Sequence, residues 1–436
     1  MESRPTQAQE TTMLVLDRIT LIDGTGAKPV TDAAILIDGE RIVAAGPRAA
    51  VTASLPPDVE RLDGGGRVVL PGLIDCHDHL AHTERDLMAL AASPLSLRIL
   101  QVAENLKTTL AAGITTMRDA GGLDVGFKQA VEQGLIPGPR LMLGLTIISR
   151  TGGIDDPQLR SGISLDWRFL PGLPSPVANG VEEVRKKVRE VLHAGADVVK
   201  CASTGGVSSR TLTALDETMT LAELQVIVDE ARMLNKKTFV HAYGGPGLEN
   251  AVIAGIDSIE HGAYLCRLPE TIRRMANQGT FLVPTLMVIA LHRQQGSPWA
   301  RVKATEMREE HRRSIHMAME AGIPVAMGTD AGFYGHGRNA MELTLLVEEG
   351  LTPMQAIVAS TATAAACLGL EREIGTLEPG KLADLLIVEG DPLQDISLLE
   401  RQESLTMVMK GGQPFVDRLP RGVSVAQVSG ALSRLR

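Results

Sequence analysis

Eight apolar, strand-like runs alternate with helical patterns through most of this 436-residue chain, and the alternation limits the folds open to it. Such runs are typical of parallel strands that helices cover on their outer face. They are Val68–Asp75, Ile114–Arg118, Leu141–Ile147, Val198–Lys200, Thr238–His241, Ser258–His261, Thr280–Leu286 and Pro324–Thr329. Eight strand–helix units predict an α/β fold built as a TIM-type (β/α)8 barrel.

Helical patterns follow most of the runs, and each ends near a glycine or asparagine, as helices often do. They are Leu97–Ala112, Val181–Ala194, Leu221–Leu234, Glu270–Asn277 and Val302–Glu320. A flat, doubly wound sheet is the alternative. It is disfavoured because no GxGxxG phosphate loop follows a strand.

Short strand patterns with turn signals occupy both ends of the chain. They are Met13–Leu16, Ile19–Leu21, Ala34–Ile37, Arg41–Ala45, Ala383–Val388 and Leu405–Lys410. We expect the two ends to form one small composite β-sandwich, with residues 1–68 and 371–436 flanking a barrel of residues 69–370. Two separate end caps are the alternative.

Residues 155–176 interrupt the alternation with Trp167, Phe169 and two prolines, and they show no clear period. A long insertion after the third strand would overhang the active face of a barrel, so a lid is one interpretation. A plain surface excursion is the other.

Composition excludes several classes of protein. The net charge is -9 without a basic cluster, which argues against nucleic acid or an anionic membrane as a partner. The four cysteines form no CxxC pair, so we expect buried thiols in a reducing compartment. Residues 1–12 have no apolar signal core, and no apolar run reaches membrane-spanning length. We therefore expect a soluble, cytoplasmic protein.

Six side chains at or just past the ends of these strand-like runs are candidate metal ligands. His77 and His79 are two residues apart in LPGLIDCHDHL, so both can face one cation at a strand end. His241 in TFVHAYG and His261 in SIEHG close successive runs and can bind a second cation. A histidine in such a place is otherwise a core or capping residue.

Lys200 closes the apolar run ADVVK, where a charged ammonium is costly to bury. One interpretation is a lysine whose head reaches solvent. The other is a neutral amine that takes up carbon dioxide, giving a carbamate whose two oxygens can bridge two metal ions. Asp330 in VAMGTDAG can touch one metal and take a proton from water, unless it is a helix N-cap.

Together the six residues predict two divalent cations, which we expect to be zinc. His77, His79, Asp330 and the carbamate would hold one ion, and His241, His261 and the carbamate the other. Two such ions lie ~3.5–4 Å apart and bridge a hydroxide that attacks a carbonyl. Asp330 would then pass a proton to the leaving nitrogen.

The chain resembles the amidohydrolase superfamily in the segments LPGLIDCHDHL, GITTMRD, VVKCASTGG, TFVHAYG, SIEHG and MGTDAG, and in the closing IGTLEPGKLADLLIV. Lys200 followed by TGG is similar to the binuclear, carboxylated-lysine branch. That branch includes Xaa-Pro dipeptidases, ochratoxin-hydrolysing amidases, and phenylurea and molinate hydrolases. The resemblance implies a barrel with a composite β-sandwich, a small-molecule amide substrate and a homo-oligomer, up to an octamer.

Peptidases of this branch usually carry TGGHG after the third strand, where this chain has Ile154 after Thr151-Gly152-Gly153. Ile154 cannot donate a hydrogen bond, so it puts dipeptide specificity in doubt. The resemblance implies that Tyr243 contacts the substrate, unless it packs under its loop. His336 and Arg338 can bind a substrate carboxylate or be exposed loop residues. Glu260 can orient a neighbouring ligand.

We expect a metal-dependent hydrolase that cleaves the C–N amide bond of an N-acyl amino acid or a dipeptide-like compound. A urea, carbamate or thiocarbamate hydrolase is the second candidate. A mononuclear cyclic amidase that resembles imidazolonepropionase is the third, and it would not need Lys200. A non-catalytic barrel protein is the remaining alternative, but such relatives have lost metal ligands.

Overall fold

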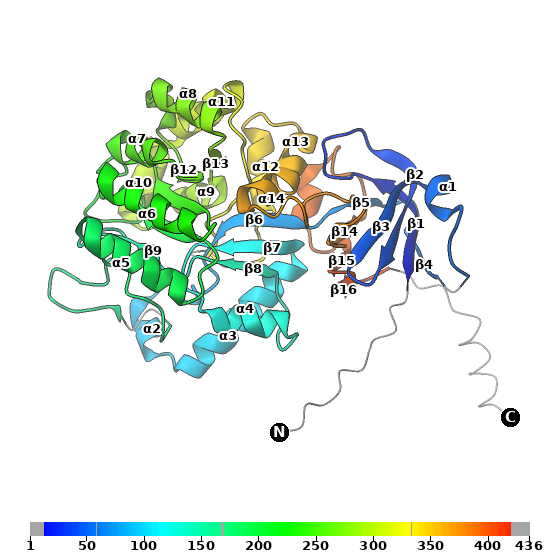
Figure 1. Cartoon of the computed structure of the whole chain (residues 1–436), viewed down its shortest axis with the longest axis horizontal. Coiled ribbons are helices and arrows are strands. Elements are labelled where there is room, and N and C mark those ends of the chain that lie inside the picture. Colours follow the sequence, from blue (N-terminus) through cyan, green and yellow to red (C-terminus); the bar gives the residue numbers. More distant parts are fainter. Residues whose placement is uncertain (1–12, 58, 167–169, 333, 420–436) are drawn as a thin grey trace.

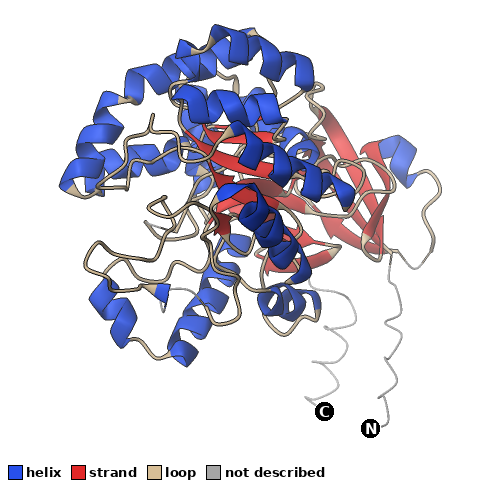
Figure 2. Cartoon of the chain, turned by 60° about the vertical axis from the view of Figure 1, so that its left-hand side comes forward, coloured by secondary structure: helices blue, strands red, loops and turns tan. Residues whose placement is uncertain are grey.

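The structure is a computed structural model that describes residues 13–57, 59–166, 170–332 and 334–419. Two parts lie side by side in it (Figure 1). One is a mixed sheet to which both ends of the chain contribute. The other is larger, and its helices surround parallel strands (Figure 2).

The mixed sheet contains eight strands in the order β16-β15-β14-β5-β1-β2-β3, with β4 paired to β1. The early strands are β1 (Leu14–Leu21), β2 (Val30–Asp38), β3 (Arg41–Pro47), β4 (Glu60–Asp63) and β5 (Val68–Pro71). The late strands are β14 (Leu385–Val388), β15 (Leu405–Lys410) and β16 (Gln413–Asp417). Because β5 pairs antiparallel with β14, the predicted union of the two chain ends in one β structure is confirmed.

A buried apolar cluster on this sheet draws side chains from both ends of the chain. It includes Ile35 and Val69 from the early strands and Leu385 and Met407 from the late ones. Removing these side chains from water stabilises the pairing by roughly 25 cal/mol for each Å² of apolar surface buried. Neither end could bury this surface without the other.

Parallel strands form the larger part in two hydrogen-bonded groups, β6-β7-β8 and β13-β12-β11-β10-β9. Their bounds are β6 (Leu73–Asp78), β7 (Ile114–Asp119), β8 (Arg140–Leu143), β9 (Ile147–Ile148), β10 (Val199–Ala202), β11 (Thr238–Ala242), β12 (Ser258–His261) and β13 (Phe281–Val283). The first predicted run is divided between β5 and β6, because Pro71 has no N–H to continue a ladder. The third predicted run, 141–147, is divided between β8 and β9.

The eighth predicted run, 324–329, is not a regular strand, but it connects the two groups of parallel strands. Ala326 donates a backbone hydrogen bond to Leu282 O of β13, at 2.9 Å. Thr329 donates another to His77 O of β6, at 3.1 Å. At Gly328 the approach is so close that an added Cβ would stand 2.3 Å from a methyl of Val283. Glycine is therefore required where this segment passes between β6 and β13.

Helices follow most of the parallel strands, as predicted. Their bounds are α2 (Leu87–Ala92), α3 (Leu95–Ala111), α4 (Val125–Glu132), α5 (Gly180–His193), α6 (Leu221–Met233), α7 (Gly245–Ala254), α8 (Pro269–Gln278), α9 (Leu286–Gln295), α10 (Pro298–Glu306), α11 (Arg308–Glu320), α12 (Met341–Glu348), α13 (Pro353–Ala359) and α14 (Ala362–Leu368). Short pieces are α1 (Arg48–Thr52), η2 (Leu265–Arg267) and η3 (Ile396–Glu400). The predicted helix 302–320 is divided between α10 and α11 at Met307.

The insertion 155–176 contains turns and one isolated bridge, Gln158 to Ser164, in its described part. Trp167 and Phe169 lie outside the described residues. The four cysteines are buried and form no disulfide with one another. Within the described ranges, no helix has both the length and the apolar character needed to cross a membrane.

Candidate metal centre

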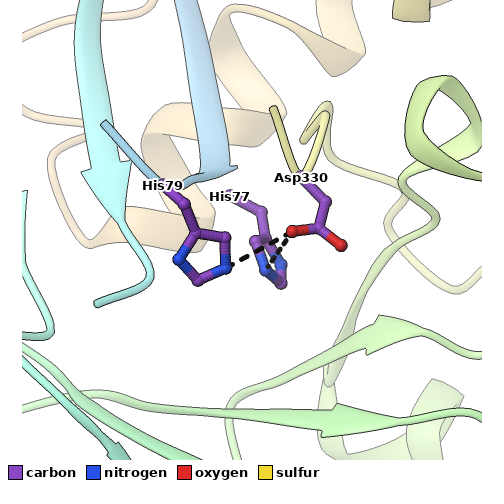
Figure 3. A group of neighbouring side chains, drawn as sticks. All are labelled: His77, His79 and Asp330. Atoms are coloured by element: carbon purple, nitrogen blue, oxygen red, sulfur yellow. Dashed lines mark ion pairs between the residues drawn. The ribbon is translucent and has the colours of Figure 1, made fainter. Parts of the chain in front are cut away.

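His77, His79 and Asp330 converge at the end of β6 (Figure 3). The Oδ1 atom of Asp330 lies 3.6 Å from Nε2 of His77 and 3.3 Å from Nε2 of His79. One ligand atom from each residue falls within 4.8 Å of the other two. Two imidazoles and a carboxylate at this spacing form a cluster that can hold a metal ion, as their positions in the sequence predict.

The hydrogen bonds of His77 and His79 fix which ring nitrogen faces the cluster. Nδ1 of His77 donates to Oε2 of Glu260 at 2.7 Å, and Nδ1 of His79 donates to Gly121 O at 3.1 Å. A neutral imidazole that donates from Nδ1 has its lone pair on Nε2. Both Nε2 atoms are therefore directed toward Asp330, which is the arrangement that metal-ligating histidines use.

His241 and His261 form a second pair, and their rings lie in the same site, since the centroids of His261 and His77 are 5.3 Å apart. Nε2 of His241 donates to Gly205 O at 3.1 Å, and Nδ1 of His261 lies within hydrogen-bond distance of Thr285 Oγ1, at 2.7 Å. The remaining nitrogens, Nδ1 of His241 and Nε2 of His261, face each other at 2.8 Å.

If Nδ1 of His261 donates to Thr285, the two facing nitrogens both carry lone pairs and need a positive charge beside them; if the Thr285 hydroxyl donates instead, Nε2–H of His261 donates to Nδ1 of His241. Burial lowers the pKa of His241 to about 4, and burial also lowers the pKa of His261 well below its ordinary value. A proton is therefore a poor source of that charge at neutral pH. His241 and His261 could both bind a divalent cation through these two nitrogens, and that cation would supply the positive charge.

The carboxylate of Asp330 stabilises positive charge next to the imidazoles of His77 and His79. Burial opposes its ionisation, but His77 and His79 lower its pKa to about 2. Burial alone would lower the pKa of His79, yet the hydrogen bond and charge of Asp330 raise it to about 9. The negative charge of Asp330 stabilises the proton on His79, and it would stabilise a metal cation in the same place.

Lys200 is the second residue of β10, which continues to Ala202, and its side chain is fully buried. Burial lowers the pKa of its amine to about 8. The Nζ atom lies 4.4 Å from the ring centre of Phe239, and no described residue forms a hydrogen bond with it. The structure therefore places Lys200 inside the protein and contradicts the interpretation in which its head reaches solvent. An unsatisfied buried amine has the reactivity that carbamate formation requires.

Two of the six candidate ligands have a strained backbone. His261 has φ +74° and Asp330 has φ +54°, in the left-handed region that residues other than glycine rarely adopt. Thr285, the hydrogen-bond partner of His261, has φ +52°. Such strain costs on the order of 1–3 kcal/mol for each residue and is concentrated at functional sites.

A buried ion pair supports the centre from beneath. Arg118 on β7 donates to Oε1 of Glu260 on β12 at 2.8 Å and to Cys76 O on β6. The other oxygen of Glu260 accepts from His77, so the carboxylate orients His77 rather than its neighbour His261. Asp75 binds the backbone N–H groups of His77 and Thr329, which ties β6 to the segment that carries Asp330.

Four further residues were predicted to belong to the site, and of these Tyr243 contacts a candidate ligand directly. Tyr243 is 3% exposed, and its ring stacks on His261 with centroids 4.5 Å apart. His336 contacts Asp78 behind the two β6 histidines, with Nδ1 3.4 Å from Oδ1. Arg338 is exposed and contacts Sδ of Met341. Ile154 is half-buried in the turn after β9.

Sequence reasoning missed several residues of the site. Arg118 and Asp75 lie within runs interpreted only as strands, and Thr285 follows a short strand without a distinctive neighbour. His292 on α9 and Tyr334 in the loop after Asp330 were not singled out, although an aromatic four residues after a candidate ligand is a usable signal. Their pairing depends on tertiary contacts, which spacing along the chain does not reveal.

Comparisons with known proteins agree with this geometry. Residues 68–415 match the model of the amidohydrolase family. Ochratoxinase of Aspergillus niger is 32% identical over 91% of this chain and 85% of its own length.

Two solved structures show the same similarity. A prolidase complexed with N-methylphosphonate-L-proline aligns with a TM-score of 0.84 at 30% identity, over 92% of this chain and 99% of that one. Molinate hydrolase aligns with a TM-score of 0.77 at 25% identity, over 96% and 99% of the two chains. The chain therefore belongs to the amidohydrolase family and is a hydrolase that acts on C–N bonds.

Proposed function

We propose that this enzyme cleaves the amide bond of a small N-acyl amino acid or dipeptide-like compound at a centre of two divalent cations, most simply zinc. The observation that carries the proposal is the pattern of hydrogen bonds around the histidines. Each of the four imidazoles has a protein hydrogen-bond partner on one ring nitrogen and turns its other nitrogen inward.

His77, His79 and Asp330 would hold one cation, and His241 and His261 the other. Lys200, carboxylated by carbon dioxide, would bridge the two. Its buried amine without a hydrogen-bond partner among the described residues fits this role. When bound, the cations supply Lewis-acid activation of water and of the amide carbonyl. A mononuclear cyclic amidase is disfavoured because it leaves Lys200 unexplained.

Asp330 and Tyr243 are the residues that we assign to proton transfer and carbonyl binding. Asp330 remains ionised at neutral pH, since its pKa is about 2, so it can accept a proton from the attacking water and pass it to the leaving nitrogen. Burial raises the pKa of Tyr243 well above its ordinary value. Its hydroxyl therefore stays protonated and can donate to the carbonyl oxygen of the amide.

The second candidate is hydrolysis of a urea, carbamate or thiocarbamate. Two observations favour it: Ile154 stands where related peptidases carry a histidine, and the chain is similar to molinate hydrolase. The similarity to ochratoxinase and prolidase favours the amide instead. The amide is preferred because both of these relatives are at least as similar in sequence as molinate hydrolase.

The proposal includes three features of the wider molecule. The two groups of parallel strands form one closed (β/α)8 barrel, which the hydrogen bonds of residues 324–331 to β6 and β13 support. The barrel spans about residues 69–370 and the β-domain 1–68 and 371–436. The enzyme would be a homo-oligomer, as its resemblance to the carboxylated-lysine branch implies, and cytoplasmic, as the sequence pattern predicts.

A substrate panel tests the proposed reaction. Protein reconstituted with zinc and bicarbonate is given N-acyl amino acids, dipeptides, phenylureas and thiocarbamates, and the released amine is measured. We expect the N-acyl amino acids to be cleaved fastest, and Asp330→Asn to lose at least about 100-fold in kcat. Faster cleavage of the ureas or thiocarbamates would replace the first candidate with the second. Cleavage of none of the four classes would refute the proposal.

A further inference from the structure

A second group of polar side chains lies at the edge of the metal centre. Tyr334 follows Asp330 by four residues, and its hydroxyl is 2.6 Å from Nδ1 of His292 on α9. Burial lowers the pKa of His292, and the charge of Asp330 acts on the same imidazole. The pair thus joins the loop that carries a candidate ligand to the helix that follows β13.

Tyr334 is held by apolar contacts on two sides. It packs against a cluster that contains Tyr243, and against another that contains Leu291 and Ala331. Tyr243 in turn stacks on the ring of His261. Tyr334 and the residue that we assign to the amide carbonyl therefore border the same apolar cluster beside the centre.

The surroundings of Tyr334 are positively charged. The guanidinium of Arg85 lies 4.6 Å from the centre of its ring, and Arg301 also acts on its hydroxyl. The side chain of Arg85 donates weakly to Gln295 O at 3.4 Å, and it forms no ion pair with a carboxylate in the described part of the chain. Tyr264 offers a contrast, because Arg267 above its ring is neutralised by Glu310 at 3.1 Å.

We propose that Tyr334 and Arg85 form a subsite for the carboxylate of the amide substrate, and that His292 is the positioning residue that orients Tyr334. The proposal assigns the Nδ1–H tautomer to His292, which donates to the hydroxyl oxygen of Tyr334 and leaves the hydroxyl proton to donate to the substrate. Arg85 adds a charge-assisted hydrogen bond. The donors to the carboxylate therefore come from the loops after β6 and after Asp330, and α9 contributes the residue that orients Tyr334.

This inference deepens the proposed function by naming the recognised group, and a binding experiment tests it without relying on turnover. The probes are 3-phenylpropionate and 3-phenylpropan-1-ol, which differ in the anionic group and contain no cleavable bond. Their affinities for metal-loaded protein are measured by calorimetry. We expect the carboxylate to bind at least about tenfold more tightly than the alcohol, since a charge-assisted hydrogen bond contributes about that much.

Variants assign the preference to the subsite. Tyr334→Phe and Arg85→Gln should each reduce the affinity for 3-phenylpropionate about tenfold and leave the alcohol unaffected. Tyr264→Phe and Arg267→Gln are matched controls, because they alter a second tyrosine–arginine pair that borders the same apolar cluster. Neither control should change the ratio of the two affinities.

His292→Phe tests the positioning role, since it keeps an aromatic ring and removes the hydrogen bond to Tyr334. It should reduce the preference for the carboxylate probe as much as Tyr334→Phe does. The double variant His292→Phe, Tyr334→Phe should lose no more of that preference than either single variant. Equal affinities of the wild-type protein for the two probes would overturn the proposal. So would a preference that survives in both Tyr334→Phe and Arg85→Gln.

Discussion

The arrangement of single side chains explains why this site attracts cations. A histidine can present one lone pair only if its other nitrogen donates a proton elsewhere. His77 uses a carboxylate for this purpose, His261 a hydroxyl, and His79 and His241 use backbone carbonyls. These hydrogen bonds fix which ring nitrogen of each histidine faces the centre before any metal binds, which reduces the cost of assembling the centre.

Lys200→Ala removes the proposed bridge between the two cations. We expect turnover to fall at least about 100-fold and metal content to fall with it, because three to four ligands are needed to hold each ion. Added acetate or propionate should restore part of both by supplying two carboxylate oxygens in place of the carbamate. Lys410→Ala, at a partly buried lysine of the mixed sheet, is the control. Unchanged turnover in Lys200→Ala would rule out the bridge.

The protonation of Lys200 predicts a dependence of carbamate formation on pH. Carbon dioxide reacts with the neutral amine, and the pKa of Lys200 is about 8 rather than the ordinary 10.5. Carboxylation of metal-free protein should therefore rise as the pH goes from 7 to 9. Carbon-13 NMR with labelled bicarbonate should show one carbamate signal that is absent in Lys200→Ala.

The same shift contributes to stability with a defined sign. The folded protein prefers the neutral amine, so the contribution of Lys200 is most unfavourable below pH 8. The free-energy penalty of burying the charged amine is relieved as the pH rises from about 8 toward 10.5.

A carbamate signal that did not change between pH 7 and 9 would contradict a buried amine with a lowered pKa.

Strand ends were the part of the site most accessible to sequence reasoning. Each candidate histidine closes or follows an apolar run, and parallel strands bring their carboxyl ends to one edge of a sheet. Arg118 was not accessible in this way, because it lies within β7 and its role depends on Glu260, 142 residues later in the chain. The residues that orient ligands come from elements whose adjacency only the folded chain defines.

Among the elements, strands β6, β7 and β12 are joined by the buried pair of Arg118 and Glu260. Neither side chain is more than 1% exposed. Such a pair contributes little net stability when intact, but the loss of one partner leaves an uncompensated charge in the interior. It therefore determines how the two groups of parallel strands are arranged around the centre.

Glu260→Gln should destabilise the protein by roughly 3–5 kcal/mol, because Arg118 would remain buried without its counter-ion. Urea unfolding of metal-free protein measures the loss without a contribution from bound metal. Glu230→Gln is a matched control, since Glu230 is also buried but pairs with the partly exposed Arg185 and Arg189. We expect the control to cost about 1 kcal/mol or less. Equal losses would show that the pair at the centre has no special role.

Element boundaries differ from the prediction where tertiary contacts override local pattern. The run 324–329 is apolar enough for a strand, yet it makes hydrogen bonds to β6 and β13 in an irregular conformation. The left-handed backbone of Asp330 ends it and turns the carboxylate toward the histidines. A periodic pattern cannot indicate such a turn, because the strain is offset by contacts from other strands.

In the molecule as a whole, the metal centre requires both groups of parallel strands. β6 provides His77, and His79 follows its last residue, while β10, β11 and β12 provide Lys200, His241 and His261. The mixed sheet fixes the start of β6, because β5 ends only two residues earlier and pairs with β14 from the far end of the chain. Both ends of the sequence are thus needed to position the first two ligands.

Family membership could be predicted from the sequence because its motifs lie at the strand ends that all such enzymes share. The substrate could not be predicted in the same way. The residues at the rim, such as Tyr334 and Arg85, lie in loops of irregular length, and their contacts follow no period. Specificity therefore has to be argued from the structure and tested by binding.

Metal content per chain, measured on protein purified without chelator or an affinity metal, tests the binuclear centre most directly. Two ions per chain are predicted, falling to about one in a His241→Asn, His261→Asn double variant that retains His77, His79 and Asp330. One ion per chain in the wild-type protein, unchanged in the double variant, would contradict a centre built from both groups of strands. It would also favour the mononuclear alternative.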